Sequence, residues 1–436
     1  MTNGSDASVP TRSLVGVEAE VEVGAVAHGG HCVARLDGRV VFVRHALPGE
    51  RARVRVTEGD TESRFLRADA IEVVTPAAGR VSPPCPYAGP GRCGGCDWQH
   101  ADLGTQRALK KAVIVEAFAR FAKLAVDVEV ETVHGDQDGL DWRTRMRYAV
   151  AADGAAGLRR HRSHEIVEID RCLIAHPLVE STEVLARFWP GFEAVEAAAS
   201  VSSGERAVVV WEGDASALVP PLETGITLTR SHGRTRSARP AHLTEEAAGR
   251  RFFVRADGFW QVHPGAADAL VSAVLDFLQP RAGERALDLY SGVGLFAAAI
   301  AERVGTSGSV LAVEGDVGAT SCARQNLADL SNTRVRQGSV DAVLREGAAR
   351  RVDLVVLDPP REGAGRAVMS AITRREPRAI AYVACDPVAL ARDIAYARKE
   401  GFQLTGLRAY DCFPMTQHVE CVALLVRGSP RSRPIQ

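Results

Sequence analysis

Short apolar strands alternate with segments of helical spacing from about residue 262 to the end of the chain, and this alternation constrains the fold most strongly. It is typical of βαβ units, which build a sheet of parallel strands with helices packed on both faces. We therefore predict an α/β fold with a doubly wound, mostly parallel sheet over residues 256–436. Its strands are expected at 285–291, 308–315, 352–360, 379–385 and 422–428.

The first predicted strand ends in a glycine-rich turn that opens a helix. Gly292 and Gly294 allow the backbone to approach a ligand closely, and the helix offers free N–H groups at its N-terminus. The next strand ends with Glu314 about 20 residues later, the spacing at which a carboxylate meets ribose hydroxyls. The turn lacks the third glycine of the dinucleotide fingerprint and resembles motif I of class I methyltransferases, which bind S-adenosylmethionine.

Three chemically active side chains flank other strands of this series. Asp358 and Cys385 each follow an apolar strand, and ligands bind outside the carboxyl ends of strands in open α/β sheets. Taken alone, Asp358 is a common strand cap and Cys385 a common packing residue. At this edge, beside an Asp–Pro turn, Cys385 is a better candidate for a nucleophile. Glu420 begins the last strand, where it is either a surface residue or a base that faces the same pocket.

The chain before this domain is expected to form three parts. Residues 1–13 are polar and predict a disordered tail, residues 14–75 predict a small β-barrel of short strands and turns, and residues 76–255 predict an α+β region. Arg51, Arg53 and Arg55 alternate along one barrel strand, so their side chains share a face. That face is either a solvated surface or the basic, RNA-binding face of an oligonucleotide-binding barrel.

The composition leaves nucleic-acid binding open and argues against a membrane protein. The chain has 436 residues, enough for two or three domains, and it contains no apolar run that is long enough to span a bilayer. Because the net charge is −1, any RNA-binding surface must be a local basic face. Arg143, Arg145 and Arg147 alternate beside aromatic residues and are expected to contact phosphates.

The cysteines indicate a metal centre in a reducing compartment. The nine cysteines are odd in number and no signal sequence precedes them, so reduced thiols and a cytoplasmic protein are expected. Cys85, Cys93 and Cys96 lie in a loop rich in Gly and Pro, and Cys172 follows downstream. Four thiolates suit either a tetrahedral Zn²⁺ site or an iron–sulfur cluster.

The ordered combination of these segments resembles the uracil-C5 RNA methyltransferase family, which acts on ribosomal and transfer RNA. The matching stretches are 259–262, 287–296, 313–314, 357–361, 385–387, 390–393 and 413–420. Residues 14–75 look like a TRAM domain, an OB-like RNA-binding barrel. The resemblance covers nearly the whole chain after residue 13 and implies a Rossmann-like methyltransferase domain at the C-terminus.

The resemblance also implies a mechanism and the residues that carry it. In this family, a cysteine thiolate adds to C6 of uracil, which makes C5 nucleophilic enough to take a methyl group from S-adenosylmethionine. Cys385 is then the nucleophile, and Glu420 is the base that removes the C5 proton. The residues implied to line the cofactor pocket are Gln261, Tyr290, Glu314 and Asp358.

The family pattern further assigns the cysteine cluster and the partner. Cys85, Cys93, Cys96 and Cys172 are implied to hold a [4Fe-4S] cluster, with Zn²⁺ as the less favoured alternative. The favoured substrate is a specific uridine of 23S ribosomal RNA, with a transfer RNA uridine as the alternative. A monomeric enzyme with no membrane association is expected.

A different class of function stays open at this level. Many family members have Asn where this chain has Leu295 and Asp386. These departures would suit a non-catalytic iron–sulfur RNA-binding protein with a degenerate methyltransferase fold. The presence of Cys385, Glu420 and Asp358 favours the enzyme.

Overall fold

The computed structural model describes residues 11–135, 138–212, 217–223, 225–232, 241–347, 349 and 351–428. It divides into two compact units, of which the first holds Met1–Leu109 with 160–162 and 415–417, and the second holds the remaining residues. Of the predicted N-terminal tail, residues 1–10 lie outside the described residues, while Ser13 forms an isolated β-bridge with Asp60.

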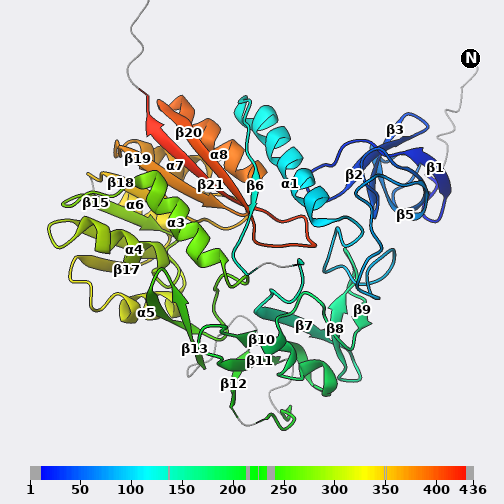
Figure 1. Ribbon diagram of the computed structural model, residues 1–436, viewed down its shortest axis with the longest axis horizontal. Coiled ribbons are helices and arrows are strands. Elements are labelled where there is room, and N and C mark those ends of the chain that lie inside the picture. Colours follow the sequence, from blue (N-terminus) through cyan, green and yellow to red (C-terminus); the bar gives the residue numbers. More distant parts are fainter. Residues whose placement is uncertain are drawn as a thin grey trace, which may run out of the picture. The chain divides into compact units, whose positions relative to one another are not determined.

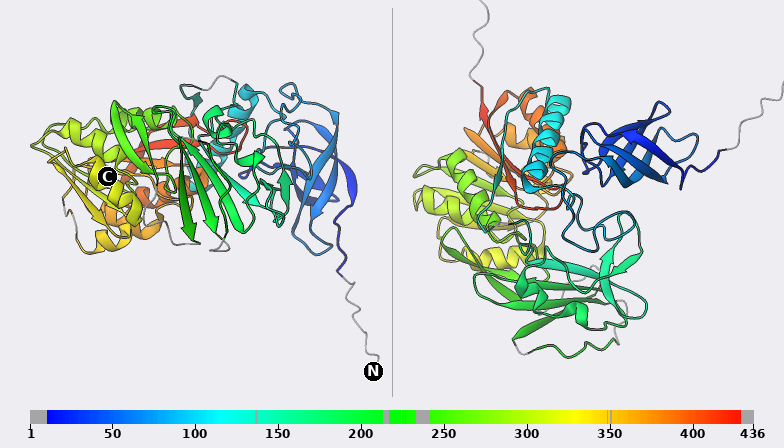
Figure 2. Two further views of the ribbon diagram at one scale, coloured as in Figure 1. Left: turned by 90° about the horizontal axis from the view of Figure 1, so that it is seen from below. Right: turned by 45° about the vertical axis from the view of Figure 1, so that its right-hand side comes forward.

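The first unit contains a five-stranded sheet that curls into the predicted small barrel (Figure 2). The strand order is β1-β4-β5-β3-β2. Along β4, Ala52, Val54 and Val56 point into the interior, and the intervening residues are exposed. The strands are β1 (Glu18–Glu22), β2 (Cys32–Leu36), β3 (Arg39–Arg44), β4 (Arg51–Glu58) and β5 (Phe65–Thr75).

The three alternating arginines of β4 share one exposed face, as predicted, but acidic side chains from the neighbouring strands pair with them. Arg51 contacts Glu20 at 2.8 Å, and Arg55 contacts Glu18 at 2.7 Å. Arg53 contacts Glu72 at 2.6 Å. Because each positive charge has a carboxylate beside it, this face is a charge-balanced solvated surface and does not form a basic patch.

The second unit begins within a long helix and contains a separate central sheet. Helix α1 (Leu103–Ala117) continues into a π-helical turn, Phe118–Ala122. The central sheet has the order β12-β11-β10-β7-β8-β9. Its strands are β7 (Arg145–Val150), β8 (Ala156–Arg159), β9 (Ile166–Glu168), β10 (Phe192–Ala199), β11 (Arg206–Glu212) and β12 (Ile226–His232). The short helices α2 (Pro177–Glu180) and η2 (Val184–Ala186) follow β9, and the hairpin of β13 (His242–Ala247) and β14 (Arg250–Arg255) leads out of this region.

The C-terminal part of the second unit is an eight-stranded sheet with helices on both faces (Figure 1). The order is β17-β16-β15-β18-β19-β21-β20-β6, in which β15 to β19 run parallel and β21 runs antiparallel to both neighbours. The strands are β6 (Val130–Thr132), β15 (Arg285–Leu289), β16 (Ser309–Glu314), β17 (Thr333–Gln337), β18 (Leu354–Leu357), β19 (Ala379–Ala384), β20 (Phe402–Asp411) and β21 (Glu420–Arg427).

Two apolar cores hold this sheet in place. Helices α3, α4 and α5 contribute to the core on one face, and α1, α6, α7 and α8 contribute to the other. The remaining helices are α3 (Ala266–Leu278), α4 (Leu295–Val304), α5 (Val317–Asn326), α6 (Val340–Arg345), α7 (Gly365–Thr373) and α8 (Pro387–Lys399). The prediction of a doubly wound α/β domain is confirmed, and its parallel strands end at one shared edge.

Candidate active site

The strand order brings Cys385, Glu420 and Asp358 to the same edge of the sheet. Because β18 and β19 are parallel neighbours, Asp358 and Cys385 both follow carboxyl ends at this edge. Strand β21 runs antiparallel beside β19 with Ala384 opposite Cys421, so the next pair outward is Cys385 and Glu420. The charges of Glu420 and Asp358 both raise the pKa of the Cys385 thiol, which is consistent with this closeness.

The surroundings of Cys385 favour the neutral thiol. Burial raises its pKa to about 12, and the carboxylates of Glu420, Asp358 and Asp386 add to this effect. Arg361 acts in the opposite direction, because its positive charge stabilises the thiolate. Arg361 belongs to the loop after β18, and its role could not be assigned from the sequence.

Asp358 and Glu420 form an interacting pair of buried carboxyl groups. Burial raises the pKa of Asp358 to about 7. Glu420 is only 4% exposed, and its pKa is raised well above the usual range by burial and by the nearby Asp358 charge. Burial and the neighbouring carboxylate therefore both favour the protonated form of Glu420.

Asp386, one of the departures from the family pattern, caps helix α8. Its Oδ1 accepts the N–H groups of Val388 at 2.9 Å and Ala389 at 2.8 Å. A carboxylate at a helix N-terminus satisfies free N–H groups and interacts favourably with the helix dipole. The residue thus has a local structural use that is independent of the adjacent thiol.

His418 lies beside Arg361 at the same edge. The distance between the Arg361 Nη2 and His418 Nε2 atoms is 3.5 Å. Burial and the positive charge of Arg361 lower the pKa of His418 to about 4, so the imidazole is neutral at physiological pH. The sequence predicts no individual role for His418, which offers hydrogen-bonding capacity without charge.

The glycine-rich turn after β15 has the geometry of a ligand-binding loop. Tyr290, Gly292 and Gly294 adopt left-handed backbone conformations with φ of 61°, 54° and 95°. Glu314 accepts the N–H of Gly292 at 2.9 Å and the N–H of Asp316 at 2.6 Å, so its carboxylate is fixed at the end of β16. The predicted pocket residues Tyr290 and Glu314 therefore lie on adjacent strand ends.

A buried carboxyl group, to which the sequence pattern assigns no role, supports this turn. Asp288 is fully buried in β15, and its Oδ2 accepts the N–H of Ala297 in the first turn of α4 at 2.7 Å. Burial raises its pKa to about 8. An acidic residue inside an apolar strand was the available signal, because such a group needs a specific hydrogen-bond partner.

Gln261 lies in the loop between β14 and α3 and is 7% exposed. The backbone N–H and the hydroxyl group of Thr144 both donate to the carbonyl of Val262, at 2.9 and 3.0 Å. These bonds tie the residue that follows Gln261 to the segment that precedes β7.

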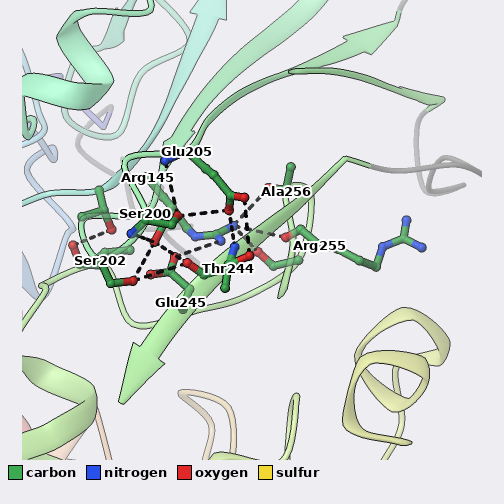
Figure 3. Close-up of polar contacts among 12 residues, drawn as sticks. Arg145, Ser200, Ser202, Glu205, Thr244, Glu245, Arg255 and Ala256 are labelled. Atoms are coloured by element: carbon green, nitrogen blue, oxygen red, sulfur yellow. Dashed lines mark hydrogen bonds and ion pairs between the residues drawn. The ribbon is translucent and has the colours of Figure 1, made fainter. Parts of the chain in front are cut away.

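The expectation that Arg145 contacts phosphate is wrong. Arg145 is 6% exposed, and Figure 3 shows its side chain within a polar network with Glu245. Its Nη1 donates to the carbonyl groups of Ala256 at 3.0 Å and Gly258 at 2.9 Å. The residue therefore fixes the segment before Gln261, while its neighbour Arg147 is exposed and lies 4.1 Å above the Trp211 ring centre.

Three of the four predicted cluster cysteines belong to one unit of the structure, and the fourth belongs to the other. Cys85, Cys93 and Cys96 are half-buried in the first unit, and burial raises the pKa of Cys93, with a further contribution from the charge of Cys85. The N–H of Gly95 donates to the Cys93 sulfur at 3.4 Å, as in loops that hold thiolate-bound metals. Cys172 is buried in the second unit. Across the described parts of the chain, no group of three or more His, Cys, Asp and Glu side chains is arranged to hold a metal ion.

Among the residues that the structure describes, no helix has the length and apolar character needed to cross a bilayer.

Comparisons with known proteins match both parts of the chain. The model of the TRAM domain matches residues 12–71. The model of the methyltransferase small domain matches residues 265–380, and that of tRNA (uracil-5-)-methyltransferase matches residues 347–428. The N-terminal barrel is therefore a TRAM domain, as predicted.

Individual relatives span nearly the full chain. An uncharacterised RNA methyltransferase of Streptomyces avermitilis is 50% identical over 94% of this chain and 98% of the relative. The 23S rRNA (uracil(1939)-C(5))-methyltransferase RlmD of Chromohalobacter salexigens is 33% identical over 94% of this chain and 89% of the relative. The crystal structure of Pyrococcus abyssi tRNA (uracil-54, C5)-methyltransferase in complex with S-adenosyl-L-homocysteine shares the fold, with a TM-score of 0.69, 22% identity and coverage of 93% of this chain and 100% of that one. With a Rossmann-like methyltransferase domain, a TRAM domain and relatives of this identity and coverage, the chain belongs to the RNA (uracil-C5) methyltransferase family.

Proposed function

We propose that this protein transfers a methyl group from S-adenosylmethionine to C5 of a specific uridine in 23S ribosomal RNA through a covalent adduct of Cys385. The observation that carries the proposal is the pairing of β19 with β21, which sets Cys385 opposite Glu420 with Asp358 beside them. A nucleophile and a base at one ligand-binding edge are what substitution at C5 of uracil requires.

The chemistry follows from these positions. The Cys385 thiolate adds to C6 of the flipped uracil, and the electrons of the C5–C6 bond move to O4. S-adenosylmethionine, when bound, would supply the methyl group that C5 accepts, and the electron pair of the broken S–C bond would stay on its sulfur. Glu420 takes the proton from C5, the C5–C6 double bond forms again, and the Cys385 sulfur leaves with its electron pair.

The protonation states set two requirements on this sequence. The thiol of Cys385 must lose its proton when substrate is bound, and Arg361 is the positive group that favours the resulting thiolate. Glu420 must be ionised at the moment of proton abstraction although its pKa is raised in the empty site. Conversely, a raised pKa makes Glu420 a stronger base once it has lost its proton.

Gln261, Tyr290, Glu314 and Asp358 would hold S-adenosylmethionine. The donor set fits a nucleoside ligand, since the Glu314 carboxylate is fixed beside a loop of left-handed backbone. We also propose that Cys85, Cys93, Cys96 and Cys172 bind a [4Fe-4S] cluster. This is supported by the charge of Cys85, which adds to burial in raising the pKa of Cys93, and by the hydrogen bond from the Gly95 N–H to the Cys93 sulfur. Quantification of iron, sulfide and zinc in protein purified without oxygen tests this assignment, and stoichiometric zinc without sulfide would overturn it.

Incubation with S-adenosylmethionine and RNA that carries 5-fluorouridine tests the covalent mechanism. Fluorine cannot leave C5 as a proton does, so we expect a protein–RNA adduct that survives a denaturing gel. The adduct should be absent in Cys385→Ala and present in Cys421→Ala, which removes a neighbouring buried cysteine. Mapping distinguishes 23S ribosomal RNA from transfer RNA, and absence of an adduct on both, with a complete metal centre, would favour a non-catalytic RNA-binding protein.

A further inference from the structure

The barrel carries a second exposed face, formed by β2, β3 and β5, that differs from the arginine face of β4. In the register of the sheet, Val40 lies opposite both Arg35 and Phe65, and Phe42 lies opposite Arg67. Paired residues and their second neighbours along a strand share a face, so these side chains point to the same side. Phe65 is 42% exposed, which is unusual for a phenylalanine on a strand.

The aromatic and cationic side chains of this face contact one another. The Phe42 and Phe65 rings meet edge to face with their centres 5.4 Å apart. The guanidinium of Arg67 lies 5.7 Å from the centre of Phe42 and 5.3 Å from that of Phe65. The result is a small platform in which the outermost ring is open to solvent and a cation adjoins it.

Two histidines support the platform from within the same unit. The His31 ring lies 6.3 Å from Phe42 and 5.7 Å from His161, in both cases edge to face. Burial lowers the pKa of each histidine to about 4, so both rings pack as neutral aromatic groups. Phe42 is therefore held between Phe65 on the outside and His31 on the inside, and its orientation is fixed.

The charges around this face are mainly positive. Arg67 and Arg162 share one carboxylate, that of Glu58, at 3.3 and 3.6 Å. Arg35 is exposed and donates to a backbone carbonyl in its own turn. The arginine face of β4 has a carboxylate for each cation, whereas here Arg67 and Arg162 share one carboxylate. A polyanion with flat aromatic groups complements this combination, and an apolar protein surface does not.

We propose that the β2–β3–β5 face of the barrel binds an unpaired nucleotide of the RNA, with its base stacked on Phe65 and its phosphates facing Arg35 and Arg67. The proposal rests on the proposed function to the extent that it takes RNA as the partner. Stacking of a base on an aromatic side chain tolerates any sequence, so this face would hold a single-stranded segment at a distance from the reacting uridine and would not select its sequence.

The binding test uses the full chain with its metal centre and a fluorescein-labelled single strand of twelve uridines, with a duplex of equal length as the comparison. Phe65→Ala should weaken binding of the single strand by about 5- to 100-fold, as expected for the loss of one stacked base. Phe65→Trp should restore binding, and the duplex affinity should stay within about twofold of the wild type.

Two controls separate this face from other exposed groups. Phe121 is an exposed phenylalanine with Arg120 at 5.3 Å from its ring centre, so Phe121→Ala removes a similar pair elsewhere. The triple change of Arg51, Arg53 and Arg55 to Gln tests the face of β4. Both control variants should bind the single strand like the wild type.

A positional readout completes the test. Single strands with 5-iodouridine should cross-link under long-wavelength light to the peptide that contains Phe65, and this product should be lost in Phe65→Ala. No binding of the single strand by the wild type, unchanged binding by Phe65→Ala, or a loss confined to the β4 variant would each overturn the proposal. Because binding needs no methyl transfer, these outcomes are independent of the fluorouridine adduct, whose absence would contradict the proposed function alone.

Discussion

The hydroxyl group of Tyr382, on β19, donates a hydrogen bond to Oδ2 of Asp393, on α8, across 2.7 Å. The same hydroxyl accepts the N–H of Ala364 at 3.0 Å, and the same carboxylate oxygen accepts the N–H of Gly365 at 3.0 Å. Both partners are fully buried. This pair therefore ties the loop that follows Asp358, and with it Arg361, to the core beneath the site.

We expect Tyr382→Phe to lower kcat about tenfold with little change in KM. The variant leaves the Ala364 N–H without its acceptor, which costs about 1 kcal/mol, and it frees the loop that positions Arg361. Steady-state methyl transfer to the RNA identified by the fluorouridine adduct measures this change. Tyr410→Phe is the matched control, since Tyr410 is also buried and its hydroxyl has no hydrogen-bond partner in the described structure. An equal loss of kcat in Tyr382→Phe and Tyr410→Phe would contradict the role of Tyr382 in positioning the loop that carries Arg361.

Asp386 should act mainly as a helix cap. Asp386→Asn keeps an oxygen that can accept the N–H groups of Val388 and Ala389, and it removes a negative charge near Cys385, so we expect unchanged stability and equal or higher kcat. Asp386→Ala removes the cap and should lower the free energy of unfolding by about 1 kcal/mol. Urea unfolding and initial rates measure the two effects, and a large loss of activity in Asp386→Asn would show that the carboxylate has a role in the reaction.

Asp288 should make stability depend on pH. Its folded-state pKa of about 8 lies above the unfolded value of about 3.9. The neutral carboxyl therefore stabilises the fold fully below about pH 4, and this contribution is lost as the pH rises to about 8. Between pH 5 and pH 9 we expect the free energy of unfolding of the wild type to fall by about 1–3 kcal/mol. That of Asp288→Asn should fall less. Urea unfolding across this pH range measures the free energy of unfolding of both proteins. If it depends on pH equally in the wild type and in Asp288→Asn, the expectation is wrong.

The reactivity of Cys385 should reveal its electrostatic surroundings. Because burial raises the pKa of the thiol to about 12, alkylation by iodoacetamide should be slow at pH 7 and should still be rising at pH 10. Arg361→Gln removes the stabilising positive charge and should slow alkylation by about three- to tenfold. Mass spectrometry of the Cys385 peptide gives the rate. The control is Arg374→Gln, an exposed arginine at the C-terminal end of α7, and a rate that levels off below pH 8 would be inconsistent with the raised pKa.

A buried ion pair anchors the segment that leads to Glu420. The Lys110 ammonium contacts Asp411, both side chains are fully buried, and Lys110 also donates to the carbonyl of Phe413 at 3.0 Å. Lys110→Met should lower the free energy of unfolding by about 3–5 kcal/mol, because it leaves a buried carboxylate without its partner. The double variant with Asp411→Leu should recover most of this loss. Chemical unfolding measures both, and a double variant that is less stable than the single one would show that the pair has another role.

The sequence by itself determined the features that depend on local patterns. Alternating apolar strands and helical segments specify a doubly wound sheet, and parallel strands end at a common edge, so the sequence alone predicts that Asp358 and Cys385 lie at the same edge. The left-handed turn at Gly292 and Gly294 was likewise readable, because glycine is the residue that such backbone conformations favour.

Only the tertiary structure decided the features that depend on which segments become neighbours. Glu420 reaches Cys385 because β21 inserts antiparallel beside β19, and no local pattern specifies that pairing. Arg145 and Arg147 look alike in the sequence, yet Arg145 is buried against Glu245 and the carbonyl groups that follow β14, and Arg147 is exposed beside the Trp211 ring. In the sequence, the arginines of β4 suggest a basic surface. In the fold, carboxylates of β1 and β5 lie beside them and balance their charge. Burial, pairing and pKa all depend on long-range contacts, and for that reason the charge and reactivity of this site follow from the fold and not from the motifs alone.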